Sequence, residues 1–202
     1  MKNERQIVLF FEKNIEFNQT QLAAKLNEKF SELGNPVILP PSDRNREQPL
    51  IIFNQSYINM TVSYNAVSFI FSEDDKDNCD KLVIRIMEIL EEFGLYFIRM
   101  GYVSTYVYGK KERKNFKSIA FKDSIPINDD FQLAWYSKEL IDSVAVNVWE
   151  RYFTDLANKL EFASVFDINT PVEEEYNISS EFVEDFCKKC DKFIEAKLKD
   201  RL

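Results

Sequence analysis

Apolar residues recur at helical spacing in three segments of the chain, residues 18–34, 72–94 and 179–202. In the first segment Asn18 and Gln21 have the spacing of a capping box, and a glycine ends each of the first two segments. Acidic residues crowd the start of the second and third segments, and lysines crowd the end of the third, as the helix dipole favours. We therefore predict three helices.

Elsewhere apolar and polar residues alternate, which is typical of strands with one buried face. The clearest example is residues 58–71, where two alternating runs flank a turn near Tyr64 and Asn65 and predict a hairpin. Residues 148–160 fit either a helical stripe or a strand that runs into a turn, and we favour the strand. The other predicted strands are residues 6–11, 49–53, 95–109, 131–137, 143–149 and 161–169.

Strands grouped between three helices indicate an α+β fold, in which about three helices cover one face of an antiparallel or mixed sheet. The chain of 202 residues is long enough for one hydrophobic core. We expect one domain over residues 1–202, with a division into halves at 1–109 and 110–202 as the alternative. Loops are predicted at residues 40–49 and 122–130.

The chain contains no histidine and only four glycines, and both facts exclude particular kinds of site. Without histidine there is no Ser-His-Asp or Cys-His triad, and the usual zinc and non-haem iron sites lack their ligand. Two glycines end helices, so too few remain for a phosphate-binding Gly-rich loop. The acidic run at residues 73–80 lacks the central glycine of a calcium loop, and an acidic helix start accounts for it. We predict no catalytic residue, no metal site and no cofactor.

Cys187 and Cys190 have the C-x-x-C spacing of redox and zinc sites, but they lie well inside the predicted last helix, beside its apolar stripe. A redox pair needs a thiolate at a helix N-terminus, and a zinc site needs four ligands, whereas Cys79 is the only other cysteine. We therefore interpret Cys187 and Cys190 as buried thiols that pack in the core. The odd number of cysteines also indicates a reducing compartment.

The net charge of −8 is distributed unevenly along the chain. Residues 72–92 carry eight acids and three bases, whereas residues 110–117 carry five bases and one acid. A protein this acidic is a poor non-specific nucleic-acid binder, so any anion site must be local. The first apolar run, residues 7–11, is too short for a signal peptide or a membrane span, so we expect a cytoplasmic protein without a membrane partner.

The strand predicted at residues 95–108 carries a row of tyrosines on one face, and a basic loop follows it. A platform that stacks bases and binds phosphate would use both features, whereas an aromatic ladder that only stabilises the sheet is the alternative. Gly101 lies inside this strand and indicates a bulge or the close approach of another segment. The candidate binding residues are Tyr102, Tyr106, Tyr108, Lys110, Lys111 and Arg113.

Four features follow one another in the C-terminal part of the chain: a helix ending in EEFG, the strand LYFIRMGYVSTYV, the segment FDINT and a closing helix. This order resembles a sporadically distributed family of uncharacterised bacterial proteins that have aromatic residues around an Arg-x-Gly strand and a later Asp-x-Asp or Asp-x-Asn. The present chain has Asp167 and Asn169 rather than paired aspartates. The resemblance implies an α+β fold and no particular activity.

Frequent Lys, Asn, Ile and Phe indicate an AT-rich bacterial or phage genome. We rank first a non-enzymatic protein-interaction module, such as a bacterial or phage inhibitor or accessory factor, that binds a protein partner or associates with itself. We rank second a nucleotide- or nucleic-acid-binding protein, or a metal-dependent enzyme, that uses the tyrosine strand and the basic loop.

Overall fold

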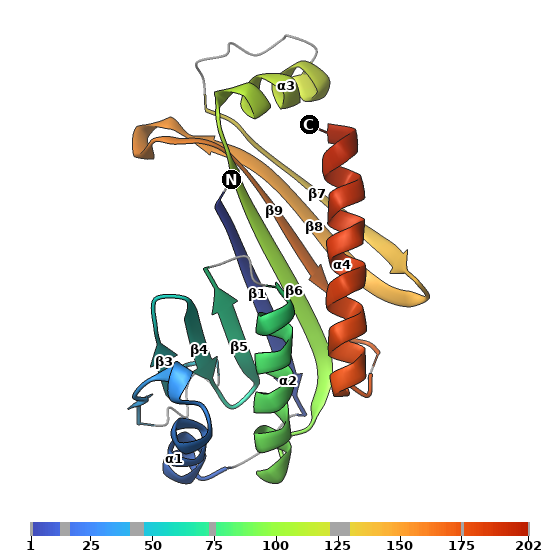
Figure 1. Ribbon diagram of the computed structural model, residues 1–202. Helices are drawn as coiled ribbons and strands as arrows, with labels where there is room; N and C mark the ends of the chain where they lie inside the picture. The colour runs from blue at the N-terminus through green and yellow to red at the C-terminus, as the bar shows by residue number, and fades with distance from the viewer. Residues whose placement is uncertain are drawn as a thin grey trace.

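In the part of the chain that the structure describes, nine strands form one continuous antiparallel sheet at the centre of the computed structural model (Figure 1). Their order across the sheet is β2-β3-β4-β5-β1-β6-β9-β8-β7. The structure describes residues 2–12, 17–40, 47–72, 76–121, 130–174 and 176–201. The strands are β1 (Lys2–Phe11), β2 (Val37–Ile38), β3 (Ile51–Asn54), β4 (Ile58–Val62), β5 (Ala66–Phe71), β6 (Phe97–Tyr108), β7 (Gln132–Ile141), β8 (Val144–Asp155) and β9 (Leu160–Asn169). The helices are α1 (Gln19–Lys29), α2 (Lys76–Glu92), α3 (Lys110–Phe121) and α4 (Ser180–Arg201), with the short 3₁₀-helices η1 (Ser31–Leu33) and η2 (Leu156–Asn158).

The fold belongs to the predicted α+β class, but the described residues form four α-helices rather than about three. The additional helix is α3, which forms where the charge pattern predicts a basic loop. Arg113, Phe116 and Lys117 are all buried at helical spacing, so the aliphatic stems of two cationic residues complete the apolar stripe of this helix. The hydrophobic pattern alone missed α3 because two of its buried positions are charged.

Helix α1 begins as predicted, because Asn18 Oδ1 accepts a hydrogen bond from the backbone N–H of Gln21 at 3.0 Å. It ends at Lys29, earlier than predicted, since Phe30 leaves the helical conformation and η1 follows. The other two predicted helices are α2 and α4. The acidic residues 73–75 and most of the two predicted loops, 41–46 and 122–129, lie outside the described residues.

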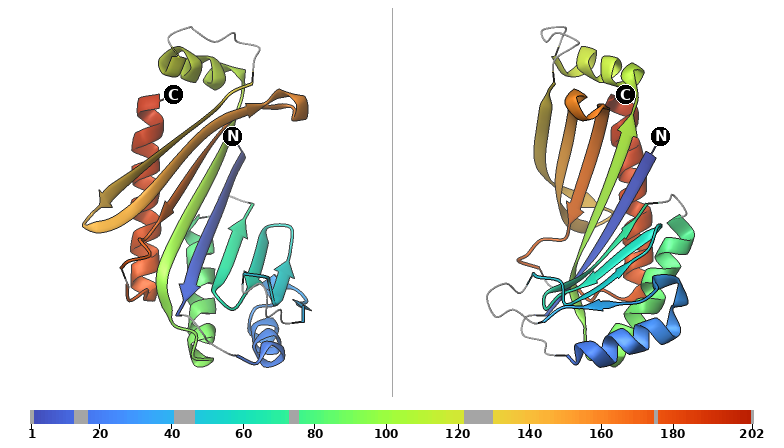
Figure 2. Two further views of the ribbon diagram at one scale, coloured as in Figure 1. Left: turned by 180° about the vertical axis from the view of Figure 1, so that it is seen from behind. Right: turned by 90° about the vertical axis from the view of Figure 1, so that its left-hand side faces the viewer.

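The helices lie on one side of the sheet, with α2 in front of β5 and β1 and α4 in front of β9 and β8 (Figures 1 and 2). Alternate residues of each strand point to this side and form the core. On the central strands, for example, Ile7 lies opposite Tyr102, and all atoms of both side chains are shielded from solvent. No helix of the described ranges packs against the other side, which we call the open face (Figure 2).

Strands β7 and β8 form a long hairpin at one edge of the sheet. Residues 148–160 form the strand that we favoured, since β8 continues to Asp155 before η2 begins. A two-residue turn joins β7 to β8, and Asp142 (φ 46°) and Ser143 (φ 72°) both adopt the positive φ that a type I′ turn requires. The tight turn places Ile141 opposite Val144 and thereby sets the register of the whole hairpin.

Candidate functional site

The tyrosines of β6 point to the helix-covered side of the sheet. Tyr102 is completely buried, Tyr106 is 4 % exposed, and Tyr108 is partly buried. The hydroxyl of Tyr102 donates a hydrogen bond to Asp191 Oδ1 of α4. Of the two interpretations of this tyrosine row, the aromatic ladder that stabilises the sheet fits the structure better than the stacking platform, because helices cover the side of β6 that carries the rings. They form an aromatic row of the core, in which the rings of Tyr106 and Tyr108 lie 6.3 Å apart.

The cations that follow β6 are separated by the first turns of α3. Lys110 and Lys111 are exposed, whereas Arg113 is buried. Arg113 Nη1 lies 3.1 Å from Glu161 Oε2 of β9, and Lys110 Nζ lies 3.6 Å from Glu161 Oε1. The carboxylate of Glu161 thus offsets part of the local positive charge. Of the six predicted binding residues, only Lys110 and Lys111 lie fully on the surface, and the structure does not bring them together with accessible tyrosine rings.

Burial raises the pKa of the Tyr108 hydroxyl to about 12. A tyrosine in the unfolded chain ionises near pH 10, so the folded state keeps a proton that the unfolded state loses between about pH 10 and 12. The stabilisation from this group is complete below about pH 10 and declines as the pH rises through this window. We expect the free energy of unfolding of Tyr108→Phe to fall less steeply over this interval than that of the wild type. Urea denaturation at a series of alkaline pH values measures this, and parallel pH dependences would contradict it.

Cys187 and Cys190 are both buried in α4, so the prediction of core thiols is confirmed. Burial raises the pKa of both groups, which keeps them protonated and poorly nucleophilic at neutral pH.

Gly101 of β6 lies on the open face, where the predicted close approach is confirmed. A Cβ atom at this position would lie 2.4 Å from Asn169 Oδ1. The side chain of Asn169 therefore occupies the space above the glycine, and its Nδ2 donates a hydrogen bond to Asp167 Oδ1. The Asp-x-Asn pair of β9 is thus held against a strand that has no side chain at the contact.

Large apolar side chains are exposed on the open face of the β7–β8 hairpin. Leu140 is 74 % exposed, Tyr136 48 % and Trp149 45 %, and we call these three residues the β7–β8 surface. The rings of Tyr136 and Trp149 lie opposite each other on the two strands, with their centroids 4.9 Å apart. The Tyr136 hydroxyl donates a hydrogen bond of 2.8 Å to Asn147 Oδ1, so the exposed ring is held in a fixed orientation. Accessible and ordered aromatic rings are typical of protein-binding surfaces.

Among the described strands, β7 lies at the edge of the sheet and pairs with β8 alone. Because Ile141 and Val144 close a two-residue turn, they exchange hydrogen bonds across the hairpin, and every second residue of β7 does the same. The backbone N–H and C=O groups of the residues between them, among them Tyr136, Lys138 and Leu140, point away from β8. The β7–β8 surface therefore adjoins a row of backbone donors and acceptors that can pair with another strand.

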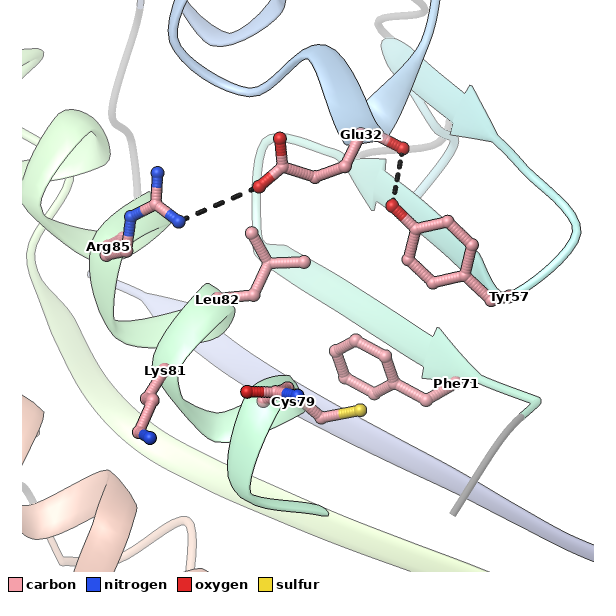
Figure 3. Close-up of a pocket in the computed structure, with 8 residues that line it drawn as sticks. Glu32, Tyr57, Phe71, Cys79, Lys81, Leu82 and Arg85 are labelled. Carbon is pink, nitrogen blue, oxygen red and sulfur yellow. Dashed lines mark hydrogen bonds and ion pairs between the residues drawn. The ribbon is translucent and has the colours of Figure 1, made fainter. Parts of the chain in front are cut away.

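A pocket of about 490 Å³ opens between α2, η1 and β5 at the other end of the molecule (Figure 3). Arg85 Nη1 lies 3.7 Å from Glu32 Oε1, and the Tyr57 hydroxyl donates a hydrogen bond of 2.8 Å to the Glu32 carbonyl oxygen. Phe71, Leu82 and the thiol of Cys79 complete the apolar part of the lining. Burial, and then the Glu32 carboxylate, raise the pKa of Tyr57. Glu32 therefore pairs with both Arg85 and Tyr57 at this pocket.

Sequence reasoning identified neither of these surfaces. The pocket draws its lining from four separate segments, none of which has a recognisable motif. The β7–β8 surface had a usable signal, because Trp135, Tyr136 and Trp149 are large aromatic residues in strands that were predicted correctly.

Within the described residues, no group of three His, Cys, Asp or Glu side chains is placed to hold a metal ion. None of the helices found there is long and apolar enough to cross a membrane. No protein-family model matches the chain, and a search of curated proteins finds no similar sequence.

Proposed function

We propose that this protein is a non-enzymatic protein-interaction module that binds its partner along strand β7 and the adjoining β7–β8 surface. The observation that carries this proposal is a ten-residue edge strand with one unpaired side, next to three large exposed apolar side chains. An added strand would satisfy the free backbone groups, and side chains of the partner would pack beside Tyr136, Leu140 and Trp149.

The rest of the molecule supports this kind of binding. Helix α4 holds the hairpin from the helix-covered side, since Lys197 Nζ lies 3.1 Å and Arg201 Nη2 3.2 Å from the two carboxylate oxygens of buried Glu150. A surface that is already ordered loses little conformational entropy when it binds. The biological role consistent with these features and with the residue bias is that of a bacterial or phage inhibitor or accessory factor.

The alternative role in nucleotide or nucleic-acid binding has less physical support. It relied on stacking by Tyr102, Tyr106 and Tyr108, but the first two side chains are inaccessible. Lys110 and Lys111 alone would provide charge without an adjacent stacking surface.

The proposal predicts that the double variant Tyr136→Glu, Trp149→Glu captures at least about tenfold less partner, because both replaced rings are binding contacts and the new charges oppose burial. The measurement is affinity capture from a lysate of the host cell, with quantification of the proteins retained by wild-type and variant baits. Tyr96→Glu is the matched control, since Tyr96 is also an exposed aromatic residue but lies away from the hairpin. Equal capture by the double variant and the wild type, or an equal loss with the control, would contradict the proposal.

A further inference from the structure

Strand β7 is complementary to a second copy of itself that runs in the opposite direction. With Ser137 opposite Ser137 of the second copy, residues 133–141 of one β7 strand lie opposite residues 141–133 of the other. The pairs in this register are Leu133 with Ile141, Ala134 with Leu140, Trp135 with Glu139, and Tyr136 with Lys138. Two of them are apolar, and the pair of Tyr136 and Lys138 allows an ammonium group to lie on an aromatic ring.

Neighbouring registers are less favourable. In the joined sheet, two residues that lie opposite each other must point to the same face. Only registers centred on a residue, and not between two residues, meet this condition. Centring the pairing on Lys138 or on Glu139 places two like charges directly opposite each other, which destabilises antiparallel pairs. Centring it on Tyr136 places Lys138 opposite Ala134 and Glu139 opposite Leu133, so that neither charge has a suitable neighbour.

The backbone of β7 is arranged correctly for this register. Tyr136 and Lys138 point their N–H and C=O groups away from β8, so the two residues would exchange hydrogen bonds with their counterparts on the second strand. The same holds for Ala134 and Leu140. About eight hydrogen bonds would form across the two-fold axis, since each such pair contributes two. Ser137 would form a pair without hydrogen bonds, the type in which side chains approach most closely.

The charges contributed by α4 also match across the axis. On the helix-covered side, the Arg201 guanidinium lies 4.7 Å from the ring centroid of Trp135. Glu139 of the second copy would lie opposite this tryptophan and therefore close to the guanidinium. Among the described residues of its own chain, Glu139 lies 3.7 Å from Lys197 Nζ, which is a long contact for an ion pair. Because the axis is two-fold, the attraction would occur twice in the assembly.

We infer that the partner of β7 is a second copy of this chain, and that two β7 strands pair antiparallel about a two-fold axis at Ser137 to join both sheets. This inference rests on the proposed function, because it names the partner of the same edge strand. It also explains why Leu140, which is 74 % exposed, lies on an edge strand: Ala134 of the second copy and its neighbours would cover it.

The test is disulfide trapping in a Cys79→Ser background, which leaves only the two buried cysteines of α4. Ser137→Cys is expected to form a covalent dimer on mild oxidation, since the two residues face each other at a Cα separation suited to a disulfide. Ala134→Cys is the matched control and is expected to remain uncrosslinked, because its counterpart lies several residues away along the opposite strand. The mass of the wild-type protein in solution, measured by analytical ultracentrifugation, is expected to be that of a dimer.

A wild-type monomer would overturn the inference, and so would a dimer in which Ser137→Cys does not crosslink although circular dichroism shows it folded. A monomer that captures a different protein through Tyr136 and Trp149 would remove the second copy as partner but leave the proposed function standing. A monomer without any capture that depends on these residues would remove both.

Discussion

Replacing Arg5 with methionine is expected to lower the free energy of unfolding by about 3 to 5 kcal/mol, because it leaves a buried carboxylate without its counter-charge. Arg5 is 4 % exposed and Asp80 7 % exposed, and Arg5 Nη2 lies 2.7 Å from Asp80 Oδ1. The guanidinium also lies 5.0 Å from the ring centroid of Tyr102, whose hydroxyl is bound to Asp191. The cluster thereby links β1 and β6 to both α2 and α4. Urea denaturation followed by circular dichroism measures the loss.

Two further variants show whether this loss comes from the buried charge. Lys25→Met removes one partner of an exposed ion pair, with Lys25 Nζ 3.7 Å from Glu92 Oε2, and is expected to cost less than about 1 kcal/mol. The double variant Arg5→Met, Asp80→Leu removes both buried charges and is expected to recover at least half of the loss. If Arg5→Met cost no more than Lys25→Met, or if the double variant recovered nothing, this account of the cluster would be wrong.

Replacing Phe116 with alanine is expected to lower the free energy of unfolding by about 3 to 5 kcal/mol, since it opens a cavity in an aromatic cluster. Phe116 is the main apolar contact of α3, and its ring is fully buried. Its centroid lies 4.5 Å from that of Tyr152, 5.1 Å from Phe162 and 5.8 Å from Phe131. The same denaturation experiment measures the effect.

Ile119→Ala in the same helix is the matched control for Phe116→Ala. Ile119 is 56 % exposed, so removing its side chain is expected to change the free energy of unfolding by less than about 0.5 kcal/mol. Similar losses for the two variants would contradict the packing of α3 through Phe116.

Several elements were predictable because their signals are local. The cap at Asn18 and the alternation in residues 58–71 depend on neighbours in the chain, and both appear in the structure as predicted. The buried pair of thiols in α4 followed from the helical period in the same way. Helix α3 was missed because a local pattern cannot show that Arg113 and Lys117 bury their stems against strands that come later in the chain.

The candidate site was less predictable than the fold. Alternation along β6 correctly assigned Tyr102, Tyr106 and Tyr108 to one face, but it does not say which face of a sheet the helices cover. That choice depends on contacts such as the one between Tyr102 and Asp191, which are 89 residues apart.

Of the elements in the described residues, eight of the nine strands and three of the four helices follow from the amino-acid sequence, as does the absence of histidine chemistry, since they depend on residue type and on spacing within one segment; the two-residue strand β2 was not predicted. The burial of the tyrosine row and the position of β7 at the edge of the sheet are properties of the assembled fold. Both depend on which strands pair and on which side of the sheet α4 packs. These arrangements are decided by the burial of apolar surface between segments that are far apart in the chain. The proposed binding surface is therefore a consequence of tertiary structure, even though its aromatic residues are visible in the sequence.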